Sequence, residues 1–198
     1  MNRLPKSLLL LVLFVLSPAA RAQDVALEVR AFMEGRDRAI KEAVRGINQN
    51  PASREKARAL INDRIDFEEM GRLSLGAHFE GLTEAQRRDF VETFGGIVRA
   101  QSLSDLSVYN AVVRFDSVGV TGNKAYVLTA ARVDNTTLKV EYLLHRRENL
   151  WWLYDIIIDD VGTVEGYSVS FQSFIRKRGF DQFMTSLRKK LAREKSAS

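Results

Sequence analysis

The N-terminal third of the chain carries apolar residues three and four positions apart, the spacing of one face of a helix. The clearest case is residues 24–48, which contain no proline. Its apolar positions are Val25, Val29, Phe32, Met33, Ile40, Val44 and Ile47. This pattern predicts a long helix that ends before Pro51, because the residue before a proline disfavours the helical region. A second helix is predicted over 52–61.

Capping residues mark two further helices. Asp66 is a predicted N-cap, and the helix that it begins should end at Gly76. Thr83 and Gln86 form a capping-box pattern ahead of a long helix. The large apolar residues of that helix fall on one face: Phe90, Phe94, Ile97 and Val98.

Two adjacent glycines, Gly95 and Gly96, fall inside this last helix. Each costs about 1 kcal/mol relative to alanine in a helix interior. The pair is either a tolerated weak point or a place where the helix backbone passes close to a bulky group. The sequence leaves both interpretations open.

From position 111 the apolar period changes to two, which is typical of strands. Four strands are predicted, at 112–120, 124–133, 138–146 and 150–160. Their short connections, with turn residues at 122–123, 134–135 and 148–149, predict an antiparallel meander. Helical spacing returns after Gly166 and continues to Leu191. The predicted fold class is therefore α+β, with N-terminal helices, a twisted four-stranded antiparallel sheet and C-terminal helices.

The fourth predicted strand is apolar on both faces. Simple alternation places Trp151, Leu153 and Ile157 on one face, and Trp152, Tyr154, Ile156 and Ile158 on the other. Both faces should then be covered. A twisted sheet crossed by helices leaves a hollow between the layers, and we expect part of this strand to face that hollow.

The N-terminus has the pattern of a secretory signal. Arg3 and Lys6 precede an apolar run over 8–16 that is too short to span a bilayer. The sequence 20–22, Ala-Arg-Ala, fits a cleavage site. We therefore expect a signal peptide over 1–22, a single domain over 23–198, and a periplasmic location.

Composition removes several classes of function. The chain has no cysteine, which excludes disulfides, thiol nucleophiles, thiolate metal sites and a lipid-modified cysteine. Without residues 1–22 the formal net charge falls from +5 to +2, and residues 175–198 alone carry +6. A nearly balanced charge argues against nucleic-acid binding. The basic end is either a solvated helix end or a contact for anionic lipid headgroups or an acidic partner.

Candidate catalytic groups are few. His78 and His145 have no partners at the spacing of a metal site or a catalytic triad. Asp155 and Asp159 would lie about 13 Å apart along a strand, beyond the separation of paired hydrolytic carboxylates. No glycine-rich phosphate loop occurs. We expect no catalytic residue, metal or cofactor, although a single buried Asp155 remains an alternative as a general base.

Several short motifs follow one another along the chain. They are Asp66–Phe67 with Met70, Leu75–Gly76, 83–86 with Phe90 and Phe94, 140–143, 151–161, and Phe171, Ile175 and Gly179. In the order and spacing of these motifs, most of the predicted domain, 23–198, resembles the MlaC family of periplasmic phospholipid-binding proteins, also called toluene-tolerance proteins or ABC transporter auxiliary components. The chain departs from the family pattern at Phe79, at 159–162 and at Ser168.

The resemblance implies an NTF2-like or cystatin-like arrangement with a cavity between sheet and helices. It implies a monomeric carrier that binds a phospholipid by its acyl chains and maintains outer-membrane lipid asymmetry. The expected partners are an inner-membrane ABC transporter complex with its substrate-binding ring and an outer-membrane lipoprotein complex. The lipid class, including a hopanoid-like cargo, stays open.

Elementary energetics fit such a carrier. Each buried methylene contributes about 0.8 kcal/mol, so exposing two chains of roughly fourteen methylenes to water costs on the order of 20 kcal/mol. The expected lipid-binding residues are large apolar side chains of the long helix, the sheet and the C-terminal helices. They are Phe94, Val98, Leu128, Tyr142, Leu144, Ile156, Ile158, Phe171, Phe174 and Phe183.

Two other classes of function remain open on the sequence. One is a small enzyme of the ketosteroid-isomerase-like kind, with Asp155 as its general base. The other is an exported adaptor that binds only protein through its basic end.

Overall fold

The computed structural model describes residues 18–104, 106–133 and 135–197. The helices are α1 (Pro18–Arg45), α2 (Pro51–Asn62), α3 (Phe67–Leu75), α4 (Ala77–Glu80), α5 (Glu84–Gln101), the 3-10 helix η1 (Ser107–Asn110), α6 (Thr163–Arg178) and α7 (Phe180–Ala197). Most of the predicted signal peptide lies outside the described residues, and 18–22 form the start of α1. The boundary at 22 therefore stays a prediction.

The predicted caps are confirmed by their hydrogen bonds. Asp66 Oδ1 accepts from the backbone N–H of Glu69 at 3.0 Å and begins α3. Thr83 and Gln86 exchange both bonds of a capping box at the start of α5. At α2 the cap is Asn50, whose side chain accepts from the third residue of the helix. Local chemistry of this kind fixes where each helix begins.

The strands form one antiparallel meander in the order β1-β2-β3-β4-β5. They are β1 (Val112–Thr121), β2 (Lys124–Val133), β3 (Thr136–Arg147), β4 (Leu150–Ile158) and β5 (Val161–Gly162). The α+β class is confirmed, with one more strand than predicted. The strand predicted over 150–160 ends at Ile158 because Asp159 and Asp160 adopt φ values of 46° and 66°, which turn the chain into β5.

The predicted faces of β4 are wrong beyond its middle. Leu144 of β3 pairs with Leu153, but Leu143 pairs with Asp155, so Tyr154 is an extra residue in β4. This β-bulge changes which residues share a face. Ile156 is therefore on the same side as Leu153, not on the opposite side as alternation predicts. A second register shift, between Phe115 and Ser117, occurs in β1.

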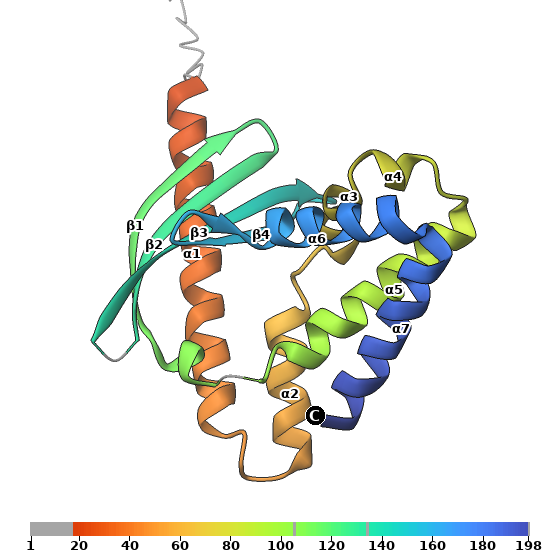
Figure 1. Cartoon of the computed structure of the whole chain (residues 1–198). Coiled ribbons are helices and arrows are strands. Elements are labelled where there is room, and N and C mark those ends of the chain that lie inside the picture. Colours follow the sequence, from red (N-terminus) through yellow and green to blue (C-terminus); the bar gives the residue numbers. More distant parts are fainter. Residues whose placement is uncertain (1–17, 105, 134, 198) are drawn as a thin grey trace, which may run out of the picture.

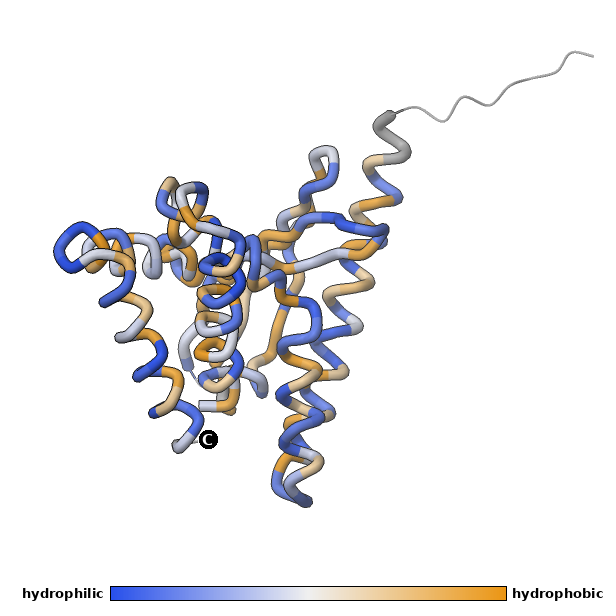
Figure 2. The backbone as a smooth tube through the Cα atoms, turned by 90° about the vertical axis from the view of Figure 1, so that its right-hand side faces the viewer, coloured by the Kyte–Doolittle hydropathy of each residue, from blue (hydrophilic) through white to orange (hydrophobic). Residues whose placement is uncertain are grey.

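The elements form two layers (Figures 1 and 2). In the first, α1 crosses the sheet and packs Val29 and Met33 against Leu144 and Trp151. The second contains α3, α5, α6 and α7, and its core is aromatic, with Phe90 at its centre. Figure 2 also shows hydrophobic and hydrophilic residues alternating along helices and strands, as expected for elements with one buried face.

The layers are joined at the chain segment between α2 and α3. Ile65 forms a parallel bridge with Leu153 of β4. The backbone N–H of Leu153 donates to the carbonyl of Arg64 at 2.8 Å, and the N–H of Asp66 donates to the carbonyl of Leu153 at 2.7 Å. These bonds hold the start of the helical layer against the sheet.

Close packing explains the glycine pair of α5. A Cβ on Gly96 would lie 3.0 Å from Leu191 Cδ1 of α7. A Cβ on Gly95 would lie 3.1 Å from Phe67 Cγ of α3. The interpretation of a close backbone approach is therefore confirmed.

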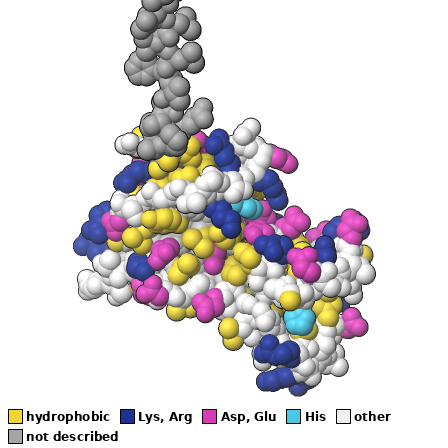
Figure 3. Space-filling view, turned by 90° about the horizontal axis from the view of Figure 1, so that it is seen from above, with side chains coloured by type: hydrophobic (Ala, Val, Ile, Leu, Met, Phe, Trp, Pro, Cys, Tyr) yellow, Lys and Arg dark blue, Asp and Glu magenta, His cyan; other side chains and the backbone are white. Residues whose placement is uncertain are grey.

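The face of the molecule seen from above carries charges of both signs (Figure 3). From above, Lys and Arg side chains alternate with Asp and Glu, and hydrophobic side chains lie between them (Figure 3). Among the residues that the structure describes, no helix is both long and apolar enough to cross a membrane.

Candidate functional site

An apolar cavity of about 290 Å³ lies between the inner face of the sheet and the helices α1, α2 and η1. From α1 it is lined by Phe32, Met33 and Ile40. Ile61 closes it from the end of α2, and Val108 from η1. The strands supply the remaining wall, so segments from most of the chain meet around one space.

Strand pairing sets the sheet side of this cavity. Ala131 of β2 is paired with Leu138 of β3, and both line the cavity. Tyr142 is paired in turn with Ile156 of β4, and both line it as well. The bulge at Tyr154 is what places Leu153 and Ile156 in the same wall.

Two of the three charged side chains at the cavity, Arg36 and Asp37, are held in ion pairs. Arg36 donates through Nη1 to Asp63 at 2.7 Å and through Nη2 to the carbonyl of Leu60 at 2.7 Å. Asp37 accepts from Lys41 Nζ at 2.7 Å. With these two groups paired and most of the other lining residues apolar, the cavity suits hydrocarbon rather than an ionic ligand.

Two other polar side chains meet the cavity without adding a reactive group. The Arg64 guanidinium lies 5.4 Å from the centre of the Trp152 ring. Burial raises the pKa of the Tyr142 phenol, and the nearby charge of Asp37 acts in the same direction. The phenol therefore stays neutral at pH 7 and adds no charge to the wall.

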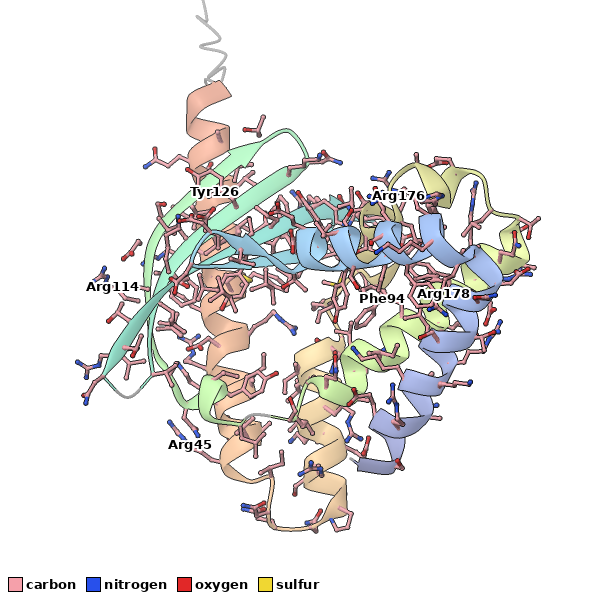
Figure 4. All side chains as sticks on the ribbon, in the orientation of Figure 1. Arg45, Phe94, Arg114, Tyr126, Arg176 and Arg178 are labelled. Carbon is pink, nitrogen blue, oxygen red and sulfur yellow. The ribbon has the colours of Figure 1, made fainter. Side chains whose placement is uncertain are left out.

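Three of the sequence-predicted site residues line this cavity: Tyr142, Ile156 and Ile158. Four others line a second, smaller pocket between α5, α6 and α7: Phe94, Phe171, Phe174 and Phe183. Figure 4 shows Phe94 in the helical layer, beside α6.

The remaining three lie elsewhere. Leu144 is fully buried in the core between α1 and the sheet. Val98 packs against the core of the helical layer. Leu128 follows Val127 in β2 and so faces the opposite side of the sheet. For all ten residues, contact with a lipid stays a prediction.

Sequence reasoning did not select several residues that line the cavity. Phe32, Met33 and Ile40 belong to the apolar face of α1, which its helical period had marked. Ala131 and Val140 lie at alternate strand positions that face the core. The period signals were present for each of them, but they do not distinguish a cavity wall from solid core.

Asp155, the candidate general base, caps a helix. Its Oδ1 accepts from the backbone N–H of Ile156 at 2.8 Å and of Val164 at 3.0 Å, at the start of α6. Burial raises the pKa of its carboxyl group, although these backbone donors lower it in part. Asp155 is not among the residues that line the cavity. Its geometry is that of a structural cap.

The neighbour of His145 is one carboxylate, not a set of metal ligands. His145 Nε2 lies 2.9 Å from Asp66 Oδ2, which links β3 to α3. Over residues 18–104, 106–133 and 135–197, no group of three or more His, Asp or Glu side chains could hold a metal ion.

Both the sequence and the fold are similar to those of known proteins. The family model described as "MlaC protein" matches residues 37–189. A phospholipid-binding protein from Ralstonia solanacearum, solved in complex with a phospholipid, superposes with a TM-score of 0.65 at 19% identity, over 79% of this chain and 94% of that one. At 19% sequence identity, this structural match shows that the two proteins share a fold. No curated protein matches the sequence. The family match spans well over half of the chain, and this protein therefore belongs to the MlaC family.

Proposed function

We propose that the chain is a periplasmic carrier that encloses the acyl chains of a phospholipid in the 290 Å³ cavity and moves the lipid between two membranes. The observation that carries the proposal is the cavity itself, apolar and walled by both sheet and helices. Family membership and the phospholipid bound by the Ralstonia solanacearum protein support the same class of ligand.

The mouth of the cavity suits a lipid whose head stays in solvent. Val108 and Ile158 line the cavity but are 48% and 45% exposed, so they mark where it opens. A ligand pocket usually measures about 300–1,000 Å³, and this cavity, at about 290 Å³, lies just below that range. The small, apolar space favours hydrocarbon tails over a polar headgroup, and we infer that the headgroup stays in solvent.

The wider cycle belongs to the same proposal. A signal peptide over 1–22 would deliver a single domain, 23–198, to the periplasm. There the carrier would exchange phospholipid between an inner-membrane ABC transporter complex with its substrate-binding ring and an outer-membrane lipoprotein complex. The cost of exposing acyl chains to water, about 0.8 kcal/mol for each methylene, is what makes an enclosed passage necessary.

Two adjacent alanines of β2 offer a matched test. Ala131 lines the cavity, and its neighbour Ala130 points to the other face of the sheet. Ala131→Trp fills the cavity, whereas Ala130→Trp adds the same bulk outside it. Mass spectrometry of solvent extracts should find phospholipid in the wild type and in Ala130→Trp, and about tenfold less in Ala131→Trp.

Circular dichroism establishes that both variants are folded before lipid is compared. Transfer of a fluorescent phospholipid between two vesicle populations, separated by a filter that passes protein, measures the carrier step in the same variants. Wild type without phospholipid, or equal phospholipid in the two variants, would overturn the proposal.

A further inference from the structure

The second pocket lies wholly within the helical layer. It has a volume of about 200 Å³ between α5, α6 and α7, and it shares no lining residue with the larger cavity. An apolar cavity of about 150 Å³ is already large enough to bind benzene. The pocket therefore has room for a segment of one hydrocarbon chain.

The inner part of the pocket is aromatic. Phe94, Phe171 and Phe183 are buried there, with ring centres 5.8 Å apart for the first two and 4.9 Å for the last two. Phe174, on the next turn of α6, lies 6.0 Å from Phe183. The three buried rings form the floor of the pocket, and a tail that enters from solvent meets the partly buried Phe174 and Tyr167.

The outer part of the pocket is polar and basic. Ser170 and Ser186 line it from exposed positions, together with Lys190 and Arg193 of α7. No acidic side chain lines it. In the described part of the chain, no ion pair involves either of these two cations, whereas Arg188 of the same helix pairs with Asp89.

One carboxylate does lie near. Glu194 is close enough to Tyr167 to raise the pKa of that phenol, after the larger effect of burial. Its Oε1 accepts from Gln101 Nε2 at 2.9 Å, which directs the group toward α5. The surrounding segment, 175–198, nevertheless carries a net charge of +6. The local field at the pocket therefore favours an anion.

We propose that this pocket is a second binding site, for a single-chain anionic amphiphile. The tail lies against Phe174 and Tyr167, and a carboxylate or phosphate accepts from Lys190 and Arg193. A fatty acid and a lysophospholipid share this chemistry. The site is separate from the phospholipid cavity, so the protein can hold both kinds of lipid at once.

The test uses the full chain loaded with phospholipid, so that the larger cavity is occupied. Oleate, lysophosphatidylglycerol and the uncharged dodecyl maltoside are titrated calorimetrically below their micellar concentrations. At least one anionic probe should bind with a stoichiometry of one, more tightly than the uncharged one and more weakly as salt rises. Oleate binding identifies a carboxylate site, and binding of the lysophospholipid alone identifies a phosphate site.

Substitutions that remove one positive charge test where the anionic headgroup of the amphiphile binds. Lys190→Gln and Arg193→Gln should each weaken anionic binding about fivefold, the effect expected of a partly exposed ion pair. Lys189→Gln is the matched control, because Lys189 is exposed and does not line the pocket. Equal affinities of the Lys190→Gln and Lys189→Gln variants would overturn the proposal.

A substitution by a larger side chain tests where the tail binds, and it changes no residue of the core. Ser186 is exposed at the rim, so Ser186→Trp blocks the pocket while the fold is retained, and all three probes should lose measurable binding. Thr185→Trp, at an exposed neighbouring position outside the pocket, should bind as the wild type does. Binding that survives in Ser186→Trp would refute the site. Phospholipid retention, measured in the same variants, reports separately on the carrier function.

Discussion

Asp66 and His145 are 79 residues apart in the chain, yet the carboxylate Oδ2 of one lies 2.9 Å from Nε2 of the other. Arg147 Nη1 lies 3.2 Å from the same oxygen. The second oxygen of Asp66 accepts from the N–H of Glu69 at 3.0 Å. One buried carboxylate thus begins α3 and ties the helical layer to β3.

Loss of this carboxylate should be costly. Asp66→Ala removes a helix cap and leaves two basic side chains without their shared partner, so the free energy of unfolding should fall by about 2–4 kcal/mol. Asp66→Asn keeps an oxygen for the cap and should lose about half as much. Urea denaturation at pH 7 measures both.

The matched control is Asp160→Asn, because asparagine tolerates the φ of 66° at this position. Asp160 is exposed and pairs with Lys139, so loss of its charge should change stability by no more than about 0.5 kcal/mol. A loss at Asp66 as small as the loss at Asp160 would contradict the role assigned to Asp66.

Helical glycines should respond to alanine according to their surroundings. A Cβ on Gly71 would lie 2.9 Å from Phe90 Cε1, and Phe90 is fully buried and stacked on Phe94 at 5.6 Å. Gly71→Ala should therefore destabilise the protein by about 1–3 kcal/mol through overpacking. Thermal unfolding measures the change.

At Gly166 of α6, a Cβ would meet nothing within 4 Å. Gly166→Ala should therefore stabilise the protein by up to about 1 kcal/mol, because alanine favours the helix and restricts the unfolded chain. If both alanine variants shifted the melting temperature in the same direction, the packing at Gly71 would not be what distinguishes them.

Headgroup tolerance should follow from the charge pairs at the larger cavity. Arg36 and Asp37 are each held in an ion pair, and the guanidinium of Arg64, the third charged group of the lining, lies 5.4 Å from the centre of the Trp152 ring, so we expect none of the three to select a headgroup. Phosphatidylethanolamine and phosphatidylglycerol with the same acyl chains should compete within about threefold of each other. Binding should change little between 50 and 500 mM salt, because tail burial is not screened.

Competition in mixed vesicles, followed by mass spectrometry of the reisolated protein, measures that ratio. If the protein instead preferred the anionic lipid tenfold or more, and lost that preference at high salt, a charged residue would be shown to bind the headgroup.

The helix starts could be predicted because each depends on residues only three positions apart, as at Asp66 and Thr83. The residues that β4 contributes to the cavity wall could not be predicted. Tyr154 is an extra residue that exists only in the pairing of β4 with β3, and the alternation of apolar residues carries no sign of it. After that position the two faces of the strand exchange, and Ile156 joins Leu153 at the cavity.

The residues that line each pocket could not be predicted from the sequence either. Phe94 and Phe171 have the spacing of a core face, and so does Phe32 of α1. Periodicity marks all three as buried but does not say which space each one meets. Only the packing of distant segments separates the wall of the larger cavity, where Phe32 lies, from the smaller pocket that the other two line.

Asp155 should give the protein a recognisable dependence on pH. Burial raises the pKa of its carboxyl group above the ordinary value of 3.8. Between the two values the unfolded chain has released the proton while the folded chain retains it. The unfolded state then binds fewer protons, so the free energy of unfolding falls as the pH rises through this window.

Asp155→Asn removes this titration and keeps an oxygen that can accept from Ile156 and Val164. The difference in stability between variant and wild type should therefore grow in favour of the variant as the pH rises above about 4 and level off once the wild-type group is ionised. Urea denaturation from pH 3.5 to 7 measures it. The lowered pKa of Glu69, due first to its hydrogen bond with Arg72, weakens both proteins alike on acidification and cancels in the difference. Parallel stability curves would show that Asp155 has the same pKa in the folded and unfolded chains.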